Sequence, residues 1–120
     1  MNETQMKERT KRFAPRILKL SDALPNSRSG NAIANQLVGS GTSVGANYRA
    51  LCRAKSRADF VNKKTSIVEE EADESCFWLE LITEAGLLPS SRVQPLLAEA
   101  GEIPAMLVAS RITAARSARR

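Results

Sequence analysis

The chain consists of four long stretches with a helical repeat of apolar residues, separated by turns that contain proline, glycine or serine. The first stretch covers residues 3–24, and its repeat is formed by Phe13, Ile17, Leu20 and Leu24. Spacings of three and four residues place these side chains on one side of a helix. Pro15 lies inside the repeat, so we expect it either to kink the helix or to mark the first turn of a shorter one.

The second stretch covers residues 29–54, but its centre is rich in glycine and serine. The run from Gly39 to Ala46 could form a loop, because a glycine inside a helix costs about 1 kcal/mol relative to alanine. We favour a continuous helix, since the apolar period resumes in phase beyond the run. Gly41 and Gly45 then form a smooth face that serves either packing within one bundle or a contact between subunits.

Residues 57–85 and 90–116 form the third and fourth stretches. Ser56 followed by Asp59 is typical of a capping box, and Gly86 suits a left-handed helix stop. The third repeat is marked by Phe60, Ile67, Trp78 and Ile82, reinforced by Val61, Val68, Ala72, Phe77, Leu79 and Leu81. The fourth is formed by Val93, Leu96, Ala100, Ile103 and Leu107. Pro104 lies inside it, and we expect a kink there.

These elements predict an all-α fold in which residues 1–120 form a single domain. Short connections between helices of about 20–30 residues favour an antiparallel up-down-up-down four-helix bundle. No hairpin dipeptide lies between alternating apolar runs, so strands are not expected.

Histidine is absent from the 120 residues. This excludes Ser-His-Asp and Cys-His catalytic groups and histidine-containing metal sites. No P-loop, dinucleotide-binding glycine motif or Cys-x-x-Cys pair occurs. We therefore expect no enzyme activity, no catalytic residue, no cofactor and no small-molecule substrate.

The cysteine content favours a reduced compartment. Cys52 and Cys76 would lie about 20 Å apart along antiparallel helices, whereas a disulfide needs Cα atoms within about 7 Å. We expect two free thiols that fill the core and do not react. No apolar run is typical of a signal peptide or a membrane-spanning helix, so we expect a cytoplasmic protein with no membrane partner.

Charged residues are sorted along the chain. The net charge of +5 combines basic blocks in residues 1–20, 48–64 and 89–120 with residues 65–88, which contain seven acids and no base. The block in residues 48–64 straddles the turn between the second and third helices. The first helix should add bases at the same end of the bundle: Lys7, Arg9, Lys11, Arg12 and Arg16.

Such a basic pole can attract a phosphate backbone, although a solvated surface is the usual role of a basic run. Base-specific readout is not expected, because most of the few aromatic residues belong to core repeats and no nucleic-acid-binding signature occurs. The residues predicted to contact nucleic acid are Arg49, Arg53, Lys55, Arg57, Lys63, Lys64, Lys11 and Arg12.

The acidic block in residues 69–74 has several interpretations. We expect no metal site, because bundle di-iron sites use Glu-x-x-His pairs, although Glu70 and Glu74 could hold a hard cation weakly. The block should mainly cover an outer face. Alternatively, Glu71 or Glu74 pairs with an arginine or with Asn47, or the block meets the basic pole of another subunit, which favours a head-to-tail ring.

Several segments carry a family resemblance: Asn35-Gln36-Leu37, residues 40–49, residues 53–56, Asp59-Phe60, residues 71–75 and Phe77-Trp78-Leu79. Through these segments, the chain resembles the small bacterial four-helix bundle proteins, which are also called the large-subunit ribosomal RNA intervening-sequence protein family. That family is related to accessory proteins of diversity-generating retroelements. The chain departs from it at Gly39 and Ala50, where we expect an arginine and an acid, and at Pro15 and Pro104.

The resemblance implies a homopentameric barrel of four-helix bundles without a catalytic site. It also implies nucleic-acid binding through a basic surface, as in the retroelement members. The residues expected at contacts between helices or subunits are Gly41, Gly45, Asn47, Tyr48, Glu71 and Glu74.

Two functions follow as hypotheses. The first is a non-enzymatic oligomeric bundle that binds structured RNA or DNA through its basic pole. The second is a protein-interaction or assembly module, with a partner such as a reverse transcriptase, in which the charges serve subunit contacts.

Overall fold

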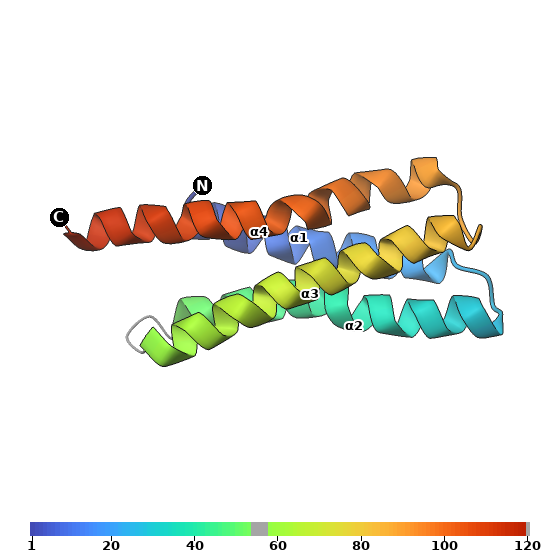
Figure 1. Ribbon diagram of the computed structural model, residues 1–120, viewed down its shortest axis with the longest axis horizontal. Helices are drawn as coiled ribbons and strands as arrows, with labels where there is room; N and C mark the ends of the chain where they lie inside the picture. The colour runs from blue at the N-terminus through green and yellow to red at the C-terminus, as the bar shows by residue number, and fades with distance from the viewer. Residues whose placement is uncertain (54–57, 120) are drawn as a thin grey trace.

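The computed structural model describes the backbone of residues 1–53 and 58–119 and the side chains of residues 1–53 and 62–109. These residues form four helices and no strand: α1 (Glu3–Asp22), α2 (Arg28–Arg53), α3 (Ala58–Glu84) and α4 (Ser90–Arg119). Each helix runs antiparallel to the one before it (Figure 1), and α4 closes the bundle by packing on α1. The predicted all-α fold of four packed helices is confirmed.

The helix ends are fixed by local hydrogen bonds and one glycine. At the start of α1, the Asn2 side chain accepts a hydrogen bond from the Gln5 amide at 2.8 Å, and the Gln5 side chain accepts one from the Asn2 amide. The Ser27 hydroxyl accepts from the Gly30 amide at the start of α2. Gly86 has φ +68° after α3, as its predicted left-handed stop requires. The predicted capping box at Ser56 lies outside the described residues.

The prolines do not shorten their helices. α1 is continuous through Pro15, so the alternative of a shorter helix is wrong. Pro15 is exposed, and water can therefore satisfy the carbonyl that has lost its helical donor. α4 likewise continues through Pro95 and Pro104.

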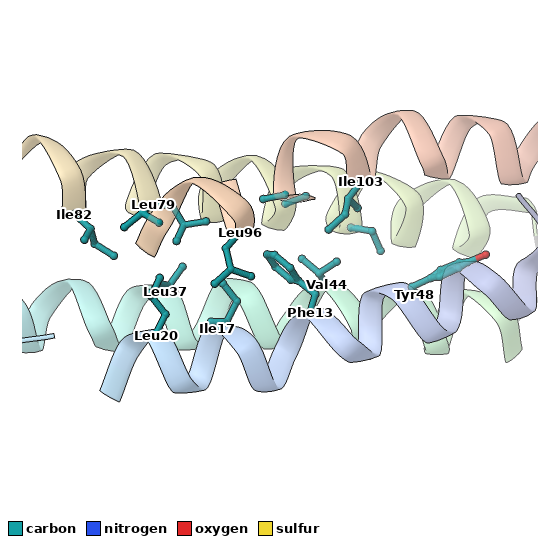
Figure 2. Packing of buried hydrophobic residues seen from close by; sticks show 14 of the residues in the cluster. Phe13, Ile17, Leu20, Leu37, Val44, Tyr48, Leu79, Ile82, Leu96 and Ile103 are labelled. Atoms are coloured by element: carbon teal, nitrogen blue, oxygen red, sulfur yellow. The ribbon is translucent and has the colours of Figure 1, made fainter. Parts of the chain in front are cut away.

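Apolar side chains from all four helices form one core, as Figure 2 shows for Phe13 of α1, Leu37 of α2, Ile82 of α3 and Ile103 of α4. The predicted repeats of α1 and α4 are buried as expected. On α3 the prediction is partly wrong, because Ile67, Trp78 and Leu81 are only half-buried and Phe77 is exposed; the side chains of the predicted Phe60 and Val61 lie outside the described residues. The buried positions of its described part are Thr65, Val68, Ala72, Ser75, Leu79 and Ile82.

Two hydroxyl residues explain this error. Thr65 and Ser75 interrupt the apolar repeat, yet both are buried. The Ser75 hydroxyl hydrogen-bonds to Ser40 of α2 at 3.1 Å, which satisfies polar atoms inside the core. As a result Trp78 is only half-buried, and Phe77 is 52% exposed.

The central glycines of α2 lie against α1. A Cβ atom on Gly45 would stand 2.9 Å from the carbonyl oxygen of Thr10, and one on Gly41 would stand 2.7 Å from the side chain of Ile17. The run from Gly39 to Ala46 is therefore helical, and two of its glycines allow the backbones of α1 and α2 to approach closely. The face formed by Gly41 and Gly45 was expected to serve either packing within one bundle or a contact between subunits, and the structure shows packing within the bundle.

No helix in the described part of the chain is both long enough and apolar enough to cross a membrane.

We predict opposite effects of two glycine substitutions in α2. Gly45→Ala should lower the free energy of unfolding by about 1–3 kcal/mol, because the added methyl group meets backbone atoms that cannot easily move. Gly39→Ala is the control: its Cβ would have no atom within 4 Å, so the gain in helix propensity should stabilise the protein by about 1 kcal/mol. Urea denaturation at one protein concentration measures both. Equal stabilities of the two variants would contradict the close approach at Gly45.

Candidate nucleic-acid interface

A hollow of about 500 Å³ lies on the outer side of the α1–α2 pair. We call it the basic groove, and it is lined by Lys7, Lys11, Ala14, Thr42, Gly45, Ala46, Arg49 and Arg53. Of the eight described residues in its lining, four are cations and three of the others are alanine or glycine. The groove therefore combines concentrated positive charge with a floor of small side chains.

Helix geometry explains why the cations meet. Lys7 and Lys11 are four residues apart on α1, and Arg49 and Arg53 are four residues apart on α2, so each pair shares one side of its helix. Because the helices are antiparallel, the N-terminal half of α1 lies beside the C-terminal half of α2 (Figure 1). Bases separated by about forty residues in sequence thereby line one hollow.

The structure brings together three of the residues predicted to contact nucleic acid, namely Lys11, Arg49 and Arg53. Lys7 completes the groove, although the sequence had indicated it only as part of a basic run. Arg12 is exposed but does not line the groove.

The remaining predicted contacts lie on or near the start of α3. Lys63 is exposed there, outside the groove lining. Lys64 is half-buried, and its ammonium group donates a hydrogen bond to the Asn47 side chain of α2 at 3.1 Å. Lys55 and Arg57 lie outside the described residues.

Two further bases of α1 belong to a different surface. Arg9 approaches Glu99 at 3.9 Å and Glu102 at 3.6 Å, and Arg16 also pairs with Glu99. Both acids lie on α4. The expectation that Arg9 and Arg16 add to the basic pole is therefore wrong, because their positions on the helix turn them toward α4.

The acidic block forms a second hollow, of about 420 Å³, which we call the acidic cluster: Glu70, Glu71, Asp73 and Glu74. Among the described side chains, no lysine or arginine forms an ion pair with these four acids. Burial raises the pKa of Glu71, and the neighbouring carboxylates Glu74 and Glu70 raise it further. Within the described residues these acids do not form a metal-binding group.

Asn47 is not available to the acidic cluster. Its amide nitrogen donates to the Ser43 carbonyl at 2.9 Å and to the Ser43 hydroxyl at 2.7 Å, while its oxygen accepts from Lys64. The alternative that Glu71 or Glu74 pairs with Asn47 is therefore wrong within this chain. Tyr48, another predicted contact residue, is buried in the core (Figure 2).

Cys52 and Cys76 are both free thiols, as predicted. Burial raises the pKa of each. The thiol therefore stays protonated more readily than an exposed one, which disfavours nucleophilic reactivity.

The fold and the groove define an all-α bundle with a cationic surface formed by two helices. The chain belongs to the family of 23S rRNA-intervening sequence proteins, which matches residues 2–109. It is also similar to the crystal structure of a protein of unknown function from the S23 ribosomal protein family of Bacteroides thetaiotaomicron. The two chains are 35% identical with a TM-score of 0.78, over 87% of this chain and 95% of the other. No curated protein matches this chain.

We predict that Glu71→Gln stabilises the protein at pH 7. The raised pKa means that the folded state binds this proton more tightly than the unfolded chain does. The ionised carboxylate therefore destabilises the fold at neutral pH, and this cost disappears as the pH falls below the ordinary glutamate value of 4.5. Removing the like charges should raise the free energy of unfolding by a few tenths of a kcal/mol, about 0.2–0.5.

Urea midpoints of both proteins at pH 7 and pH 4 measure the effect. The variant should be more stable at pH 7, and the difference should shrink at pH 4. A gain of the same size at both pH values would show that the charge of Glu71 is not its cause.

Proposed function

We propose that the protein is a non-enzymatic bundle that contacts structured RNA or DNA through the basic groove. The observation that carries the proposal is the convergence of Lys7, Lys11, Arg49 and Arg53 on one hollow. Cations gathered in this way release counterions from a phosphate backbone when they bind it, and this release drives association at low salt.

The shape of the groove supports contact with a backbone and not with bases. Its floor is formed by Ala14, Gly45 and Ala46, which allow a phosphate chain to approach the helices closely. Among the side chains that the structure describes, no aromatic residue lines the groove, so these residues offer no platform on which bases could stack. Contacts to phosphates position a nucleic acid without carrying sequence information.

Family membership supports RNA as the first probe. The family name refers to intervening sequences of 23S ribosomal RNA, and the structurally similar protein is assigned to a ribosomal protein family with unknown function. A cytoplasmic location is part of the proposal, and the two free cysteines support it.

Arg49→Ala combined with Arg53→Ala should weaken binding of a labelled RNA duplex several-fold at low salt. Two lost phosphate contacts should also reduce the slope of log affinity against log salt by about 2. Fluorescence anisotropy at several salt concentrations measures both quantities.

The matched control is Arg28→Ala combined with Arg92→Ala. Both residues are exposed and lie in the first turns of α2 and α4, at the end of the bundle away from the basic groove (Figure 1). This variant should keep the affinity and the salt slope of the unchanged protein. If the unchanged protein does not bind at low salt, or if both double variants bind equally, the proposal is wrong.

An assembly module is the second candidate function. The unpaired acidic cluster supports it, because four carboxylates that find no base in the described part of their own chain are suited to a basic partner. The partner would be another subunit or a protein such as a reverse transcriptase. The family resemblance makes a homopentameric ring the assembly to test first.

Light scattering tests this candidate directly. A pentamer should have about five times the monomer mass of 13.1 kDa, with the mass decreasing in high salt because exposed charge pairs are screened. A monomer at all protein concentrations would contradict a role in self-assembly.

A further inference from the structure

The last part of α4 extends beyond the start of α1. Glu102 of α4 lies 3.6 Å from Arg9 of α1, and the two helices run in opposite directions (Figure 1). Because α1 begins at Glu3, α4 passes that point about six residues after Glu102. Residues 110–119 continue the helix past it by about 15 Å, at a rise of about 1.5 Å per residue. We call residues 110–119 the α4 overhang.

The α4 overhang contains bases and no acid. Its bases are Arg111, Arg116 and Arg119, and Arg120 follows outside the described residues. With about 3.6 residues per turn, the three positions within the overhang share about 140° of the helix circumference. Every other residue of the overhang except Ile112 is alanine, serine or threonine. Arginines on one half of a helix thus alternate with small residues.

This composition is suited to a phosphate backbone. Guanidinium groups bind phosphate oxygens through two parallel hydrogen bonds, which is why arginine is favoured where proteins recognise phosphate. Small residues between the arginines let a backbone approach the helix closely, as the floor of the basic groove does. The acids of α4 are engaged elsewhere, since Glu99 and Glu102 lie beside bases of α1.

The overhang and the basic groove lie at the same end of the bundle but on different helices. The groove includes Arg53, the last residue of α2, and Lys7 in the second turn of α1. Among the described residues, α4 packs on α1 and α3 but not on α2, so α1 separates the two surfaces. Because a helix with its side chains is about 10–12 Å wide, the surfaces stand on the order of 20 Å apart.

We infer that the α4 overhang is a second phosphate contact, and that one nucleic acid crosses this end of the bundle and contacts both the overhang and the basic groove. The inference rests on the proposed function and adds a minimum length for the ligand. A separation of about 20 Å corresponds to roughly six base pairs at about 3.4 Å each. With a few base pairs held at each surface, a ligand needs more than about ten to bridge them.

Linked contacts make affinity depend on the length of the ligand. Once one surface holds a nucleic acid, the other meets it at a high effective concentration, so the two together bind more tightly than either alone. The gain disappears when the ligand is too short to span both surfaces. A general attraction between a basic protein and an anion would show no such threshold.

A triple substitution in the overhang tests the inference: Arg111→Ala, Arg116→Ala and Arg119→Ala. Alanine is the strongest helix former, so α4 should persist, and circular dichroism checks this. The matched control is Lys19→Ala, Arg28→Ala and Arg92→Ala. It loses the same charge from exposed residues at the opposite end of the bundle. Fluorescence anisotropy compares an RNA duplex of about 24 base pairs with an RNA hairpin whose stem has about six.

The overhang variant should bind the long duplex at least about tenfold more weakly than the unchanged protein does. Three lost phosphate contacts should also reduce the slope of log affinity against log salt by about 3. Affinity for the hairpin should change by about twofold or less, because the groove alone can hold it. The control should keep the affinity and the salt slope of the unchanged protein for both RNAs.

The results separate the inference from the proposed function. An overhang variant that matches the control, or that loses affinity equally for both RNAs, would overturn the bridge. Weaker binding by the variant with Arg49→Ala and Arg53→Ala would then still support the proposed function. If only the overhang variant loses binding and that groove variant keeps it, the groove is not the nucleic-acid site and both proposals are wrong.

Discussion

The close approach of α1 and α2 is the constraint on which the rest of the structure depends. Gly45 has no side chain between the two backbones, and a Cβ atom added there would stand 2.9 Å from the Thr10 carbonyl oxygen. Because the helices are this close, Lys7 and Lys11 of one can share a hollow with bases of the other. A larger residue at Gly45 would separate the two rows of charge as well as loosen the core.

The same geometry determines which charges remain at the surface. α1 divides its bases between two neighbours, since Arg9 and Arg16 face acids of α4 while Lys7 and Lys11 face the bases of α2. The α1–α4 side is thereby neutralised, whereas on the α1–α2 side the only groove cation that pairs with an acid among the described residues is Lys7, which approaches Glu3 at 3.9 Å. Repulsion among cations in the groove costs stability, and the proposed contact with a phosphate backbone would relieve that repulsion.

Much of the fold could be predicted from the sequence, because long apolar repeats at helical spacing leave few alternatives. The sequence also indicated that two basic runs converge. It could not indicate which bases line the groove, since that depends on the rotation of α1 between two neighbours. The buried face of α3 is predicted only in part for a related reason. Thr65 and Ser75 are polar, so the sequence indicates surface positions, but a hydroxyl group can be buried where it finds a hydrogen-bond partner, as Ser75 does in Ser40.

The distribution of charge connects these features. A groove lined by four cations and a cluster of four acids lie on the same chain, and each suits a partner of opposite charge. Among the described residues, the acids of the cluster form no ion pair with a lysine or arginine of their own chain. Any contact that these two surfaces make should weaken as the salt concentration rises, because it depends on exposed charges.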